Sequence, residues 1–292
     1  MCGNYASVFV PVRRNGVVKK ITSVKGLVRM AYDFDGEKYR KASSGQKTWG
    51  SSVISGLSLH GTEHILDLGC GDGVLTLKLA EAVPDGYVTG VDASPGMIAA
   101  ARQFTPNNLR FIHMDINDLN FHNEYDLIFS NAALHWVHNH RNLLDRSYAA
   151  LKQDGLIRWT FGGFGNCPNL NGALLEAIEL PRFRGLFSGY QWPWYLPNVL
   201  EYENLLANAH FNIHSVSLDT DKRLFSDTDA IVRWIEQPCL VPFLDFIQDE
   251  RDKKDFHDVV VNEILRRTKK GDGTHLEIFK LLNVTAAKSP TV

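Results

Sequence analysis

Residues 65–73 read ILDLGCGDG, a short apolar run that leads into three closely spaced glycines. Gly69, Gly71 and Gly73 follow an expected strand at 64–68 and open an expected helix at 74–83. In an open parallel sheet, such a strand-to-helix turn lies at the carboxyl edge, where ligands bind. Glycine lets the backbone pass close to a ligand because no Cβ intervenes. The stretch therefore predicts a ligand-binding turn in an α/β fold.

Strand-like and helical stretches alternate beyond this turn. Expected strands cover 87–91, 109–113, 125–130 and 156–161, and an expected helix covers 95–104. This alternation is typical of βαβ units and of a parallel sheet covered on both faces. Later expected elements are helices at 169–180 and 201–209, a strand at 211–218, mainly helices over 226–271, and a segment at 275–286 that is helix or strand by period. We predict a doubly wound α/β fold in which 211–218 and 275–286 complete a mostly parallel sheet, the latter as an antiparallel strand.

The chemistry around the turn indicates which ligand it takes. The spacing is GxGxG, and Val74 stands where a dinucleotide fingerprint needs its third glycine. Asp67 lies inside the strand, and its carboxylate would repel a pyrophosphate. It suits a cationic ligand better. Asp92 ends the next strand, where a carboxylate can accept hydrogen bonds from both hydroxyls of a ribose. Its alternative role is to cap the following helix, for which Ser94 is better placed.

Asp115 follows the third strand in FIHMDI and could receive the amino group of an adenine, with Ile116 against the ring. Alone this signal is weak, but it is consistent with the acids on the two preceding strands. Three strand ends that each present an acid, the first beside a glycine turn, predict an adenosyl ligand without phosphate.

The motifs ILDLGCGDG, VTGVDASPGMIAAAR, FIHMDI and YDLIFSNAALHWV resemble those of class I S-adenosylmethionine-dependent methyltransferases. SNAALHWVHNHRNLL is similar to the trans-aconitate methyltransferase branch and its malonyl-acyl-carrier-protein methyltransferase relatives. Upstream, Tyr32-Asp33 and Ser43-x-x-Gln46-x-x-Trp49 resemble the leader helix that covers the cofactor in that branch. FGGFGN, PWYLPNVLEYENLL, VRWIEQ and FKLLNVTAAK extend the resemblance, which runs from about Met30 to Lys288.

The resemblance implies a seven-stranded Rossmann-like methyltransferase fold, S-adenosyl-L-methionine as cofactor and a cofactor site on named residues. Asp67 and Gly69–Gly73 would hold the methionine part, Asp92 the ribose, and Asp115 with Ile116 the adenine, while Met97 packs on the purine. Asn131 and the residues that follow it would line the methyl group. The implied set is Tyr32, Gln46, Trp49, Asp67, Gly69, Cys70, Gly71, Gly73, Asp92, Ala93, Met97, Asp115, Ile116, Asn131, Ala132, His135 and Trp136.

The acceptor is less defined than the cofactor. The branch usually has glutamine where His135 stands, and its loop differs from FGGFGN. We expect a carboxylate of a small molecule or of a carrier-protein thioester to be methylated. The alternatives are a C-, N- or phenolic O-methyltransferase and a non-catalytic S-adenosylmethionine-binding regulator. A carboxylate needs no base at neutral pH, whereas a hydroxyl or an amine would make His135 the candidate base. We expect His135 to orient the substrate; a packed helix-start histidine is an equal alternative.

An aromatic segment is the second candidate part of the site. Trp192, Trp194, Tyr195 and, further along, Trp234 could roof an acceptor pocket together with Phe187, while Arg182 or Arg184 pairs with an acidic group. The alternative is that these aromatic side chains anchor a helical cap to the sheet.

Composition excludes several classes of partner. The chain has 292 residues and a formal net charge of −2, whereas nucleic-acid and acidic-membrane surfaces need excess Lys and Arg. No apolar run approaches the ~18–20 residues that span a bilayer. Cys2, Cys70, Cys167 and Cys239 are scattered, which is typical of reduced thiols in the cytoplasm. We therefore expect a cytoplasmic monomer or weak dimer.

Two further expectations concern metals and domains. His138 and His140 flank Asn139 without a cysteine or acidic partner at ligand spacing, so we expect a solvated loop and no metal site. We expect a flexible leader at 1–29 that is not needed for folding, one methyltransferase domain at 30–288, and a frayed tail at 289–292. Helical cap insertions are expected at about 169–209 and 219–273.

Overall fold

The computed structural model describes Tyr32 and residues 44–289, which contain a seven-stranded sheet in the order β3-β2-β1-β4-β5-β7-β6. Its strands are β1 (His64–Leu68), β2 (Tyr87–Asp92), β3 (Leu109–His113), β4 (Tyr125–Asn131), β5 (Leu151–Gly162), β6 (Phe211–Phe225) and β7 (His275–Lys288). The strands from β3 to β5 run parallel. β7 is antiparallel to both of its neighbours, β5 and β6. The expected sheet with an antiparallel last strand is confirmed.

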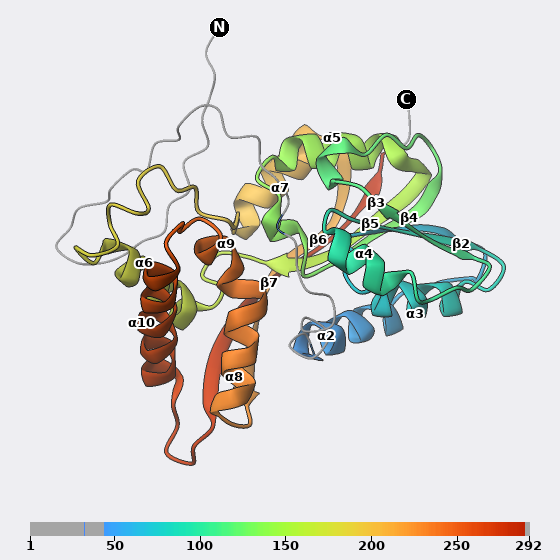
Figure 1. Cartoon of the computed structure of the whole chain (residues 1–292). Helices are drawn as coiled ribbons and strands as arrows, with labels where there is room; N and C mark the ends of the chain where they lie inside the picture. The colour runs from blue at the N-terminus through green and yellow to red at the C-terminus, as the bar shows by residue number, and fades with distance from the viewer. Residues whose placement is uncertain (1–31, 33–43, 290–292) are drawn as a thin grey trace, which may run out of the picture.

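Helices cover both faces of this sheet, and more helices form a second lobe (Figure 1). One face carries α2 (Ser44–Ser55), α3 (Val74–Ala82) and α4 (Pro95–Ala101). The other carries η1 (Ile116–Asp118), α5 (His140–Ala150) and α7 (Val199–Asn208), and η2 (Leu134–Trp136) follows β4. The second lobe holds α6 (Pro168–Glu179), α8 (Thr228–Trp234), the π-helix η3 (Ile235–Cys239), α9 (Val241–Leu244) and α10 (Glu250–Thr268).

Apolar side chains hold each layer in place. Trp159 and Tyr202 are fully buried in the core between the sheet and the helices α5 and α7. On the opposite face, Ile65 and Leu79 pack with the partly buried Ile54 of α2. Burying a side chain of this size contributes about 1.5–3 kcal/mol. The sheet is therefore anchored from both sides, as its near-continuous apolar strands predict.

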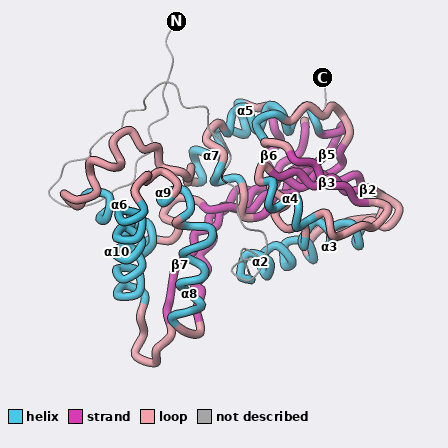
Figure 2. Tube along the Cα trace, viewed as in Figure 1, coloured by secondary structure: helices cyan, strands magenta, loops and turns pink. Residues whose placement is uncertain are grey.

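The last two strands are longer than expected and reach out of the sheet into the second lobe (Figure 2). We expected a strand at 211–218 and a helical cover from 219, but β6 continues to Phe225 and pairs with β7 as far as His275. The residues after Leu218 are mostly polar, which concealed the strand. They are tolerated because β6 lies at the edge of the sheet, where charged side chains are common.

The second lobe has its own core, built on the extended hairpin. Phe183, Phe243 and Phe256 are fully buried there, and Phe279 of β7 joins them. The fully buried Glu277 accepts a hydrogen bond from the Leu170 backbone N–H at 3.0 Å and so satisfies a free donor at the start of α6. Through Glu277 and Phe279, β7 thus holds α6 and the core of the second lobe in place.

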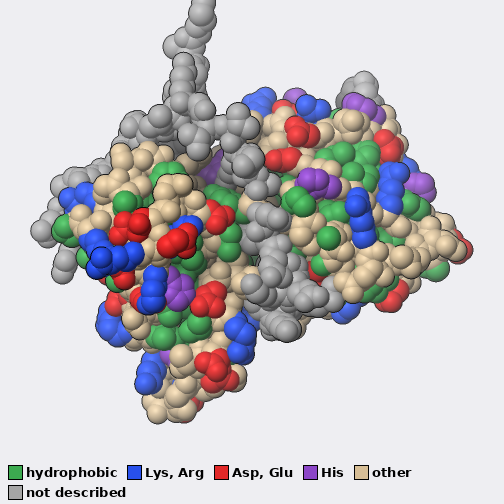
Figure 3. Space-filling view, viewed as in Figure 1, with side chains coloured by type: hydrophobic (Ala, Val, Ile, Leu, Met, Phe, Trp, Pro, Cys, Tyr) green, Lys and Arg blue, Asp and Glu red, His purple; other side chains and the backbone are tan. Residues whose placement is uncertain are grey.

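Charges on the second lobe are mixed in sign. Figure 3 shows acidic and basic side chains interspersed over the lobe that carries α6 and α10. Pairs such as Lys254 with Asp258 and Arg267 with Glu176 account for part of this pattern. Within the described part of the chain, no helix combines the length and the apolar character needed to cross a bilayer.

His140, expected in a solvated loop, is instead buried at the start of α5. Its Nδ1 lies 3.0 Å from the Tyr202 hydroxyl and its Nε2 lies 3.0 Å from the Leu134 carbonyl oxygen. The ring therefore ties α5 to α7 and to η2. Burial lowers the pKa of His140 from 6.5 to about 4, because the charged form loses its hydration.

This burial predicts a pH dependence of the free energy of unfolding. His140 is neutral in the folded protein, while the unfolded chain takes up a proton below pH 6.5. The contribution of the neutral His140 to the free energy of unfolding is fully present above pH 6.5. As the pH falls towards 4, this contribution is lost, and the free energy of unfolding decreases by about 3 kcal/mol in total. His140→Gln should flatten this part of the curve in denaturant titrations from pH 8 to 4. The exposed His122→Gln is the control, and an unchanged slope in His140→Gln would contradict the assignment.

Candidate functional site

The site begins where the turns after β1 and β4 meet, between strands whose connections leave in opposite directions. Gly69, Gly71 and Gly73 all have positive φ, at 70°, 54° and 79°, which favours glycine. A Cβ on Gly69 would lie 2.2 Å from the Cβ of Ala133, on the turn after β4. The two turns therefore touch, and the sheet edge forks at this point, as ligand sites in open α/β sheets require.

The other two glycines of the turn differ in what surrounds them. A Cβ on Gly73 would lie 2.9 Å from the Cβ of Ala101 and 2.8 Å from the Phe111 ring, so Gly73 lets α3 pack against α4 and β3. A Cβ on Gly71 would meet nothing within 4 Å. Gly71 therefore borders open space that a bound molecule can approach.

This space is a cavity of about 230 Å³ that runs from the glycine turn into the second lobe. We call its first part the glycine-loop half and its second part the aromatic half. The glycine-loop half is lined by Tyr32, Gln46, Gly69, Gly71, Asp92, Ala93, Ser94, Met97, Asp115, Ile116, Asn117, Asn131, Ala132 and Ala133. The aromatic half is lined by Trp49, His135, Trp136, Val137, Gly162, Asn166, Cys167, Leu170, Asn171, Trp194, Leu196, Trp234, Pro238, Cys239, Phe279 and Leu281.

Two carboxylates, the buried Asp67 and the partly buried Asp92, make the glycine-loop half suit a cation. Asp92 accepts hydrogen bonds from the backbone N–H of Gly71 and of Ser94, each at 2.9 Å, yet burial raises its pKa. Asp67 accepts a hydrogen bond from the Thr76 hydroxyl at 2.8 Å, and burial raises its pKa to about 7, with a further rise from the charge of Asp92. A positively charged ligand would relieve both costs.

Two more polar groups of this half retain acceptor capacity. Asn131 donates from Nδ2 to the Gln46 carbonyl oxygen at 2.9 Å, while its buried Oδ1 has no partner among the described residues. Asp115 caps η1 by accepting from the Asn117 backbone at Oδ1. Ala132, which directly follows Asn131 in the chain, has a positive φ of 56°. Such strain at a non-glycine residue is typical of functional turns.

Helix α2 closes one side of the cavity. Lys47 pairs with Asp72 at 2.7 Å, and the Trp49 indole N–H donates to Asp221 of β6 at 2.9 Å. Arg223 of β6 donates to the Gln46 side chain at 3.3 Å. Because α2 is bonded to both the glycine turn and β6, it links the two halves of the cavity.

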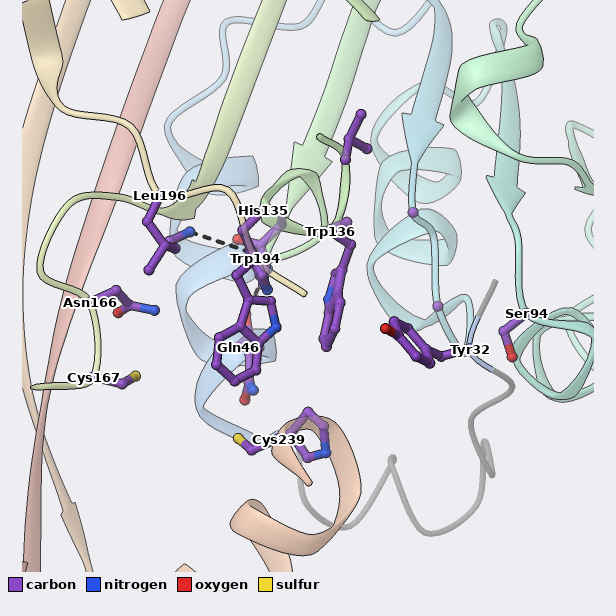
Figure 4. Close-up of a pocket in the computed structure, with 18 of the residues that line it drawn as sticks. Tyr32, Gln46, Ser94, His135, Trp136, Asn166, Cys167, Trp194, Leu196 and Cys239 are labelled. Atoms are coloured by element: carbon purple, nitrogen blue, oxygen red, sulfur yellow. Dashed lines mark hydrogen bonds between the residues drawn. The ribbon is translucent and has the colours of Figure 1, made fainter. Parts of the chain in front are cut away.

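His135 and two tryptophans stand at the boundary between the halves (Figure 4). The Trp136 ring lies 5.8 Å from the Tyr32 ring on one side and 5.7 Å from the Trp194 ring on the other. His135 is tilted against Trp136 at 5.4 Å. Burial lowers the pKa of His135 to about 4, so the imidazole is neutral at physiological pH.

The far wall of the cavity comes from the second lobe. The Trp234 and Trp49 rings lie 5.4 and 5.0 Å from the Phe279 ring, respectively. Cys167 and Cys239, both buried, complete this wall (Figure 4). Burial raises the pKa of each thiol, so both stay protonated.

Most residues expected at the cofactor site do line this space. Asp67 and Cys70 border a smaller adjoining cavity, together with Lys47, Asp72 and Leu75. Gly73 is the exception, because it packs between α4 and β3 and faces neither cavity. Asp33, Ser43 and the leader at 1–29 lie outside the described residues, as do 290–292 of the expected tail.

Only two of the four aromatic residues expected at the acceptor pocket line the cavity. Trp194 and Trp234 line the cavity, but Trp192 lies behind its wall, against Trp194 and Phe243 at 5.7 and 5.4 Å. Tyr195 also points away: its ring lies 4.7 Å from His140 and its hydroxyl donates to Glu201 at 2.7 Å. Neighbours in an extended segment face opposite ways, so Trp194 and Tyr195 cannot share the pocket.

The other expected members of the acceptor pocket also lie elsewhere. Phe187 packs in the second lobe against Phe256 at 4.9 Å. Arg182 is paired with Asp255 and Arg184 with Glu179, and neither arginine lines the cavity. These arginines therefore stabilise the cap, and the expectation that one of them pairs with an acceptor is not supported.

Several lining residues escaped the sequence analysis. Gly162 and Asn166 lie in FGGFGN, a segment noted only for its resemblance. Pro238 and Cys239 reach the cavity through the π-helix η3, which apolar periodicity does not reveal. Among the residues that the structure describes, no group of three potential metal ligands is found.

Comparison with known proteins agrees with this geometry. Residues 65–155 match the family model described as a methyltransferase domain. A trans-aconitate 2-methyltransferase from Acidovorax ebreus is 28% identical over 265 residues, which span 89% of this chain and 100% of that protein. A malonyl-[acyl-carrier protein] O-methyltransferase from Acetivibrio thermocellus is 32% identical over 142 residues, 47% of this chain and 50% of that enzyme.

Solved structures share the fold. The YcgJ protein from Bacillus subtilis superposes with a TM-score of 0.59 at 17% identity, over 84% of this chain and 100% of that one. Phosphoethanolamine N-methyltransferase 2 from Haemonchus contortus, in complex with S-adenosyl-L-methionine, gives 0.54 at 19% identity, over 87% of this chain and 57% of that one. Residues 65–155 therefore hold a methyltransferase domain, and over most of its length the chain is similar to a trans-aconitate 2-methyltransferase.

Proposed function

We propose that this chain is an S-adenosylmethionine-dependent methyltransferase that acts on the carboxylate of a small-molecule acid and forms a methyl ester. The observation that carries the proposal is the neutral, partly buried His135 at the junction of the two halves. A carboxylate is already ionised at neutral pH, so the site has to position it and exclude water rather than deprotonate it. Relatives named for trans-aconitate and for a malonyl carrier, both of which bear carboxylates, agree with this acceptor class.

We assign cofactor contacts to the glycine-loop half. Asp92 would accept from the ribose hydroxyls, since each of its oxygens holds one backbone bond and keeps a free lone pair. Asp115 and Ile116 would meet the adenine, with Met97 beneath the ring. Asn131 Oδ1, buried and without a partner among the described residues, would accept from the methionine ammonium. The open space over Gly71 fits the close passage of the chain that joins these parts.

When bound there, S-adenosylmethionine supplies an electrophilic methyl group on a positively charged sulfur. Asp67 and Asp92 would provide the complementary negative charge, which accounts for keeping two carboxylates partly or fully out of water although this raises the pKa of each. Trp136 and α2 would exclude water from the junction, where the acceptor must be aligned.

His135 is suited to donate a hydrogen bond and not to accept a proton. Its Nδ1 faces the Gly162 backbone N–H at 3.5 Å, so Nδ1 is the accepting nitrogen and the proton resides on Nε2. The Nε2–H group can then hold an acceptor oxygen. Hydroxyl and amine acceptors need a base with a pKa near the working pH, and neither this imidazole nor the protonated Cys167 and Cys239 offers one.

The ester itself is the direct test of the acceptor class. With a methyl-labelled cofactor, turnover on acids should yield products that release volatile labelled methanol on mild alkaline treatment. Products of phenols and amines carry base-stable methyl groups and serve as the comparison. A stable label from every accepted compound would contradict carboxylate methylation.

Gly71 and Gly73 form a matched pair for the cofactor assignment. Gly71→Ala costs about 1 kcal/mol of stability for its positive φ but should weaken calorimetric binding of S-adenosylmethionine about tenfold or more, equal to 1.4 kcal/mol. Gly73→Ala should cost on the order of 3 kcal/mol in denaturant unfolding, because its Cβ meets Ala101 and Phe111 as well. Equal binding losses in the two folded variants would count against the assignment.

His135→Gln separates orientation from base catalysis. The amide keeps an N–H donor, so kcat should stay within about tenfold while KM for the acid rises. Because burial holds the pKa of His135 at about 4, the wild type and His135→Gln should show the same pH dependence of kcat/KM from pH 6 to 9. A rise through pH 6–7 that vanishes in His135→Gln, with intact cofactor binding, would show that His135 is a base.

A further inference from the structure

We infer that the acceptor acid carries one carboxylate on an apolar body, and that the turn from Trp234 to Cys239 sets the length of body the enzyme accepts. The inference rests on the carboxylate methylation proposed above and adds what that function leaves open. It follows from three observations: the apolar composition of the aromatic half, the partners of the nearby basic side chains, and the π-helix η3 in the second lobe.

The aromatic half is built to receive an apolar group. Trp234 and Phe279 are 2% and 4% exposed, and Leu170, also in the wall, is 3% exposed. Their rings and methyl groups face a cavity that already contains Trp49 and Trp194. Walls of this kind gain free energy from burying hydrocarbon and lose it when they desolvate charge.

The basic side chains around this half already have acidic or polar partners. Lys47 pairs with Asp72, Arg182 with Asp255, and Arg267 with Glu176 and Glu263. Arg223 donates to Gln46 and lies 4.6 Å from the centre of the Phe225 ring. An acid with several carboxylates would have to bury the extra charges among tryptophans, whereas one carboxylate can meet the His135 N–H at the junction.

The end of the aromatic half is shaped by a π-helix. Helix α8 stops at Trp234, and the next turn, Ile235–Cys239, widens so that the Leu240 N–H bonds the Ile235 carbonyl oxygen at 3.0 Å. Pro238 lies inside this turn, and both Pro238 and Cys239 line the cavity. Such turns are rare and frequent at functional sites.

Cys239 is the small residue of this turn. Its Sγ–H points to the Trp234 carbonyl oxygen at 3.6 Å, so the thiol is engaged within its own turn and presents apolar surface to the cavity. A larger side chain at Cys239 would fill space that an acceptor can use, and a smaller one would add to it. The length of acceptor should therefore follow the size of residue 239.

The test is a series of straight-chain monocarboxylic acids from four to twelve carbons, with trans-aconitate and malonate as polycarboxylates. For the wild-type enzyme, kcat/KM should rise roughly fourfold per added methylene up to a cut-off length. The best monocarboxylate should exceed trans-aconitate by at least about tenfold. A best rate on trans-aconitate, or rates independent of chain length, would overturn the inference while leaving carboxylate methylation intact.

Variants of Cys239 test the second part. Cys239→Leu should shorten the cut-off and Cys239→Ala should extend it, while Cys239→Ser, of nearly the same volume, should leave it in place. A merely structural role would lower all rates without moving the cut-off, and that result would overturn the assignment to this turn. Cofactor affinity and thermal unfolding of each variant show that it is folded.

The same panel separates failure of the inference from failure of the proposed function. If no acid of any kind turns over, while the enzyme still binds S-adenosylmethionine and methylates a phenol or an amine, both the carboxylate function and this inference are wrong. If polycarboxylates alone turn over, the function stands and the inference falls.

Discussion

The close contact between the turns after β1 and β4 is the constraint on which the rest of the structure depends. Gly69 meets Ala133 with no room for a Cβ, so the two strand ends are held at one fixed separation. That contact brings the glycine turn, Asn131 and the His135–Trp136 pair into one cavity. Because the strands themselves are anchored by buried apolar side chains on both faces, the geometry of the site is inherited from the core of the sheet.

The charge of the site is the second constraint, and it separates the two halves. The buried Asp67 and the partly buried Asp92 lie close enough for their charges to interact, and each has a raised pKa. Such an arrangement costs stability in the free protein and favours a cationic ligand. The aromatic half, in contrast, has a neutral histidine and protonated thiols. One cavity thus combines an acidic half, to which we assign the cofactor, with an apolar half, to which we assign the acceptor.

The glycine-loop half could be predicted from the sequence because its residues follow consecutive strands. Asp67, Asp92 and Asp115 come at regular strand ends, and parallel strands place their carboxyl ends on one edge. The aromatic half depends on contacts between distant segments that local patterns do not encode. Periodicity could not show that Trp194 faces the cavity while Trp192 and Tyr195 face away.

The second lobe likewise contains elements that the sequence pattern predicted and elements that it did not. The helix at 168–179 was expected nearly as found, at 169–180, and the helix at 250–268 lies within the mainly helical stretch expected over 226–271. The extension of β6 past Leu218 was missed because a polar edge strand lacks an apolar pattern, and the π-helix was missed because one extra residue per turn leaves no sequence period. The π-helix lines the aromatic half through Pro238 and Cys239, and the extended β6 pairs with β7, whose Phe279 lines it as well.

A crystal structure with S-adenosylhomocysteine tests the central claim most directly. We predict that the ribose hydroxyls lie within hydrogen-bond distance of the Asp92 carboxylate and that the amino acid ammonium lies against Asn131 Oδ1. The sulfur should face the aromatic half beside His135. Density for the nucleoside away from the turn after β1, or a sulfur directed away from His135 and Trp136, would contradict it.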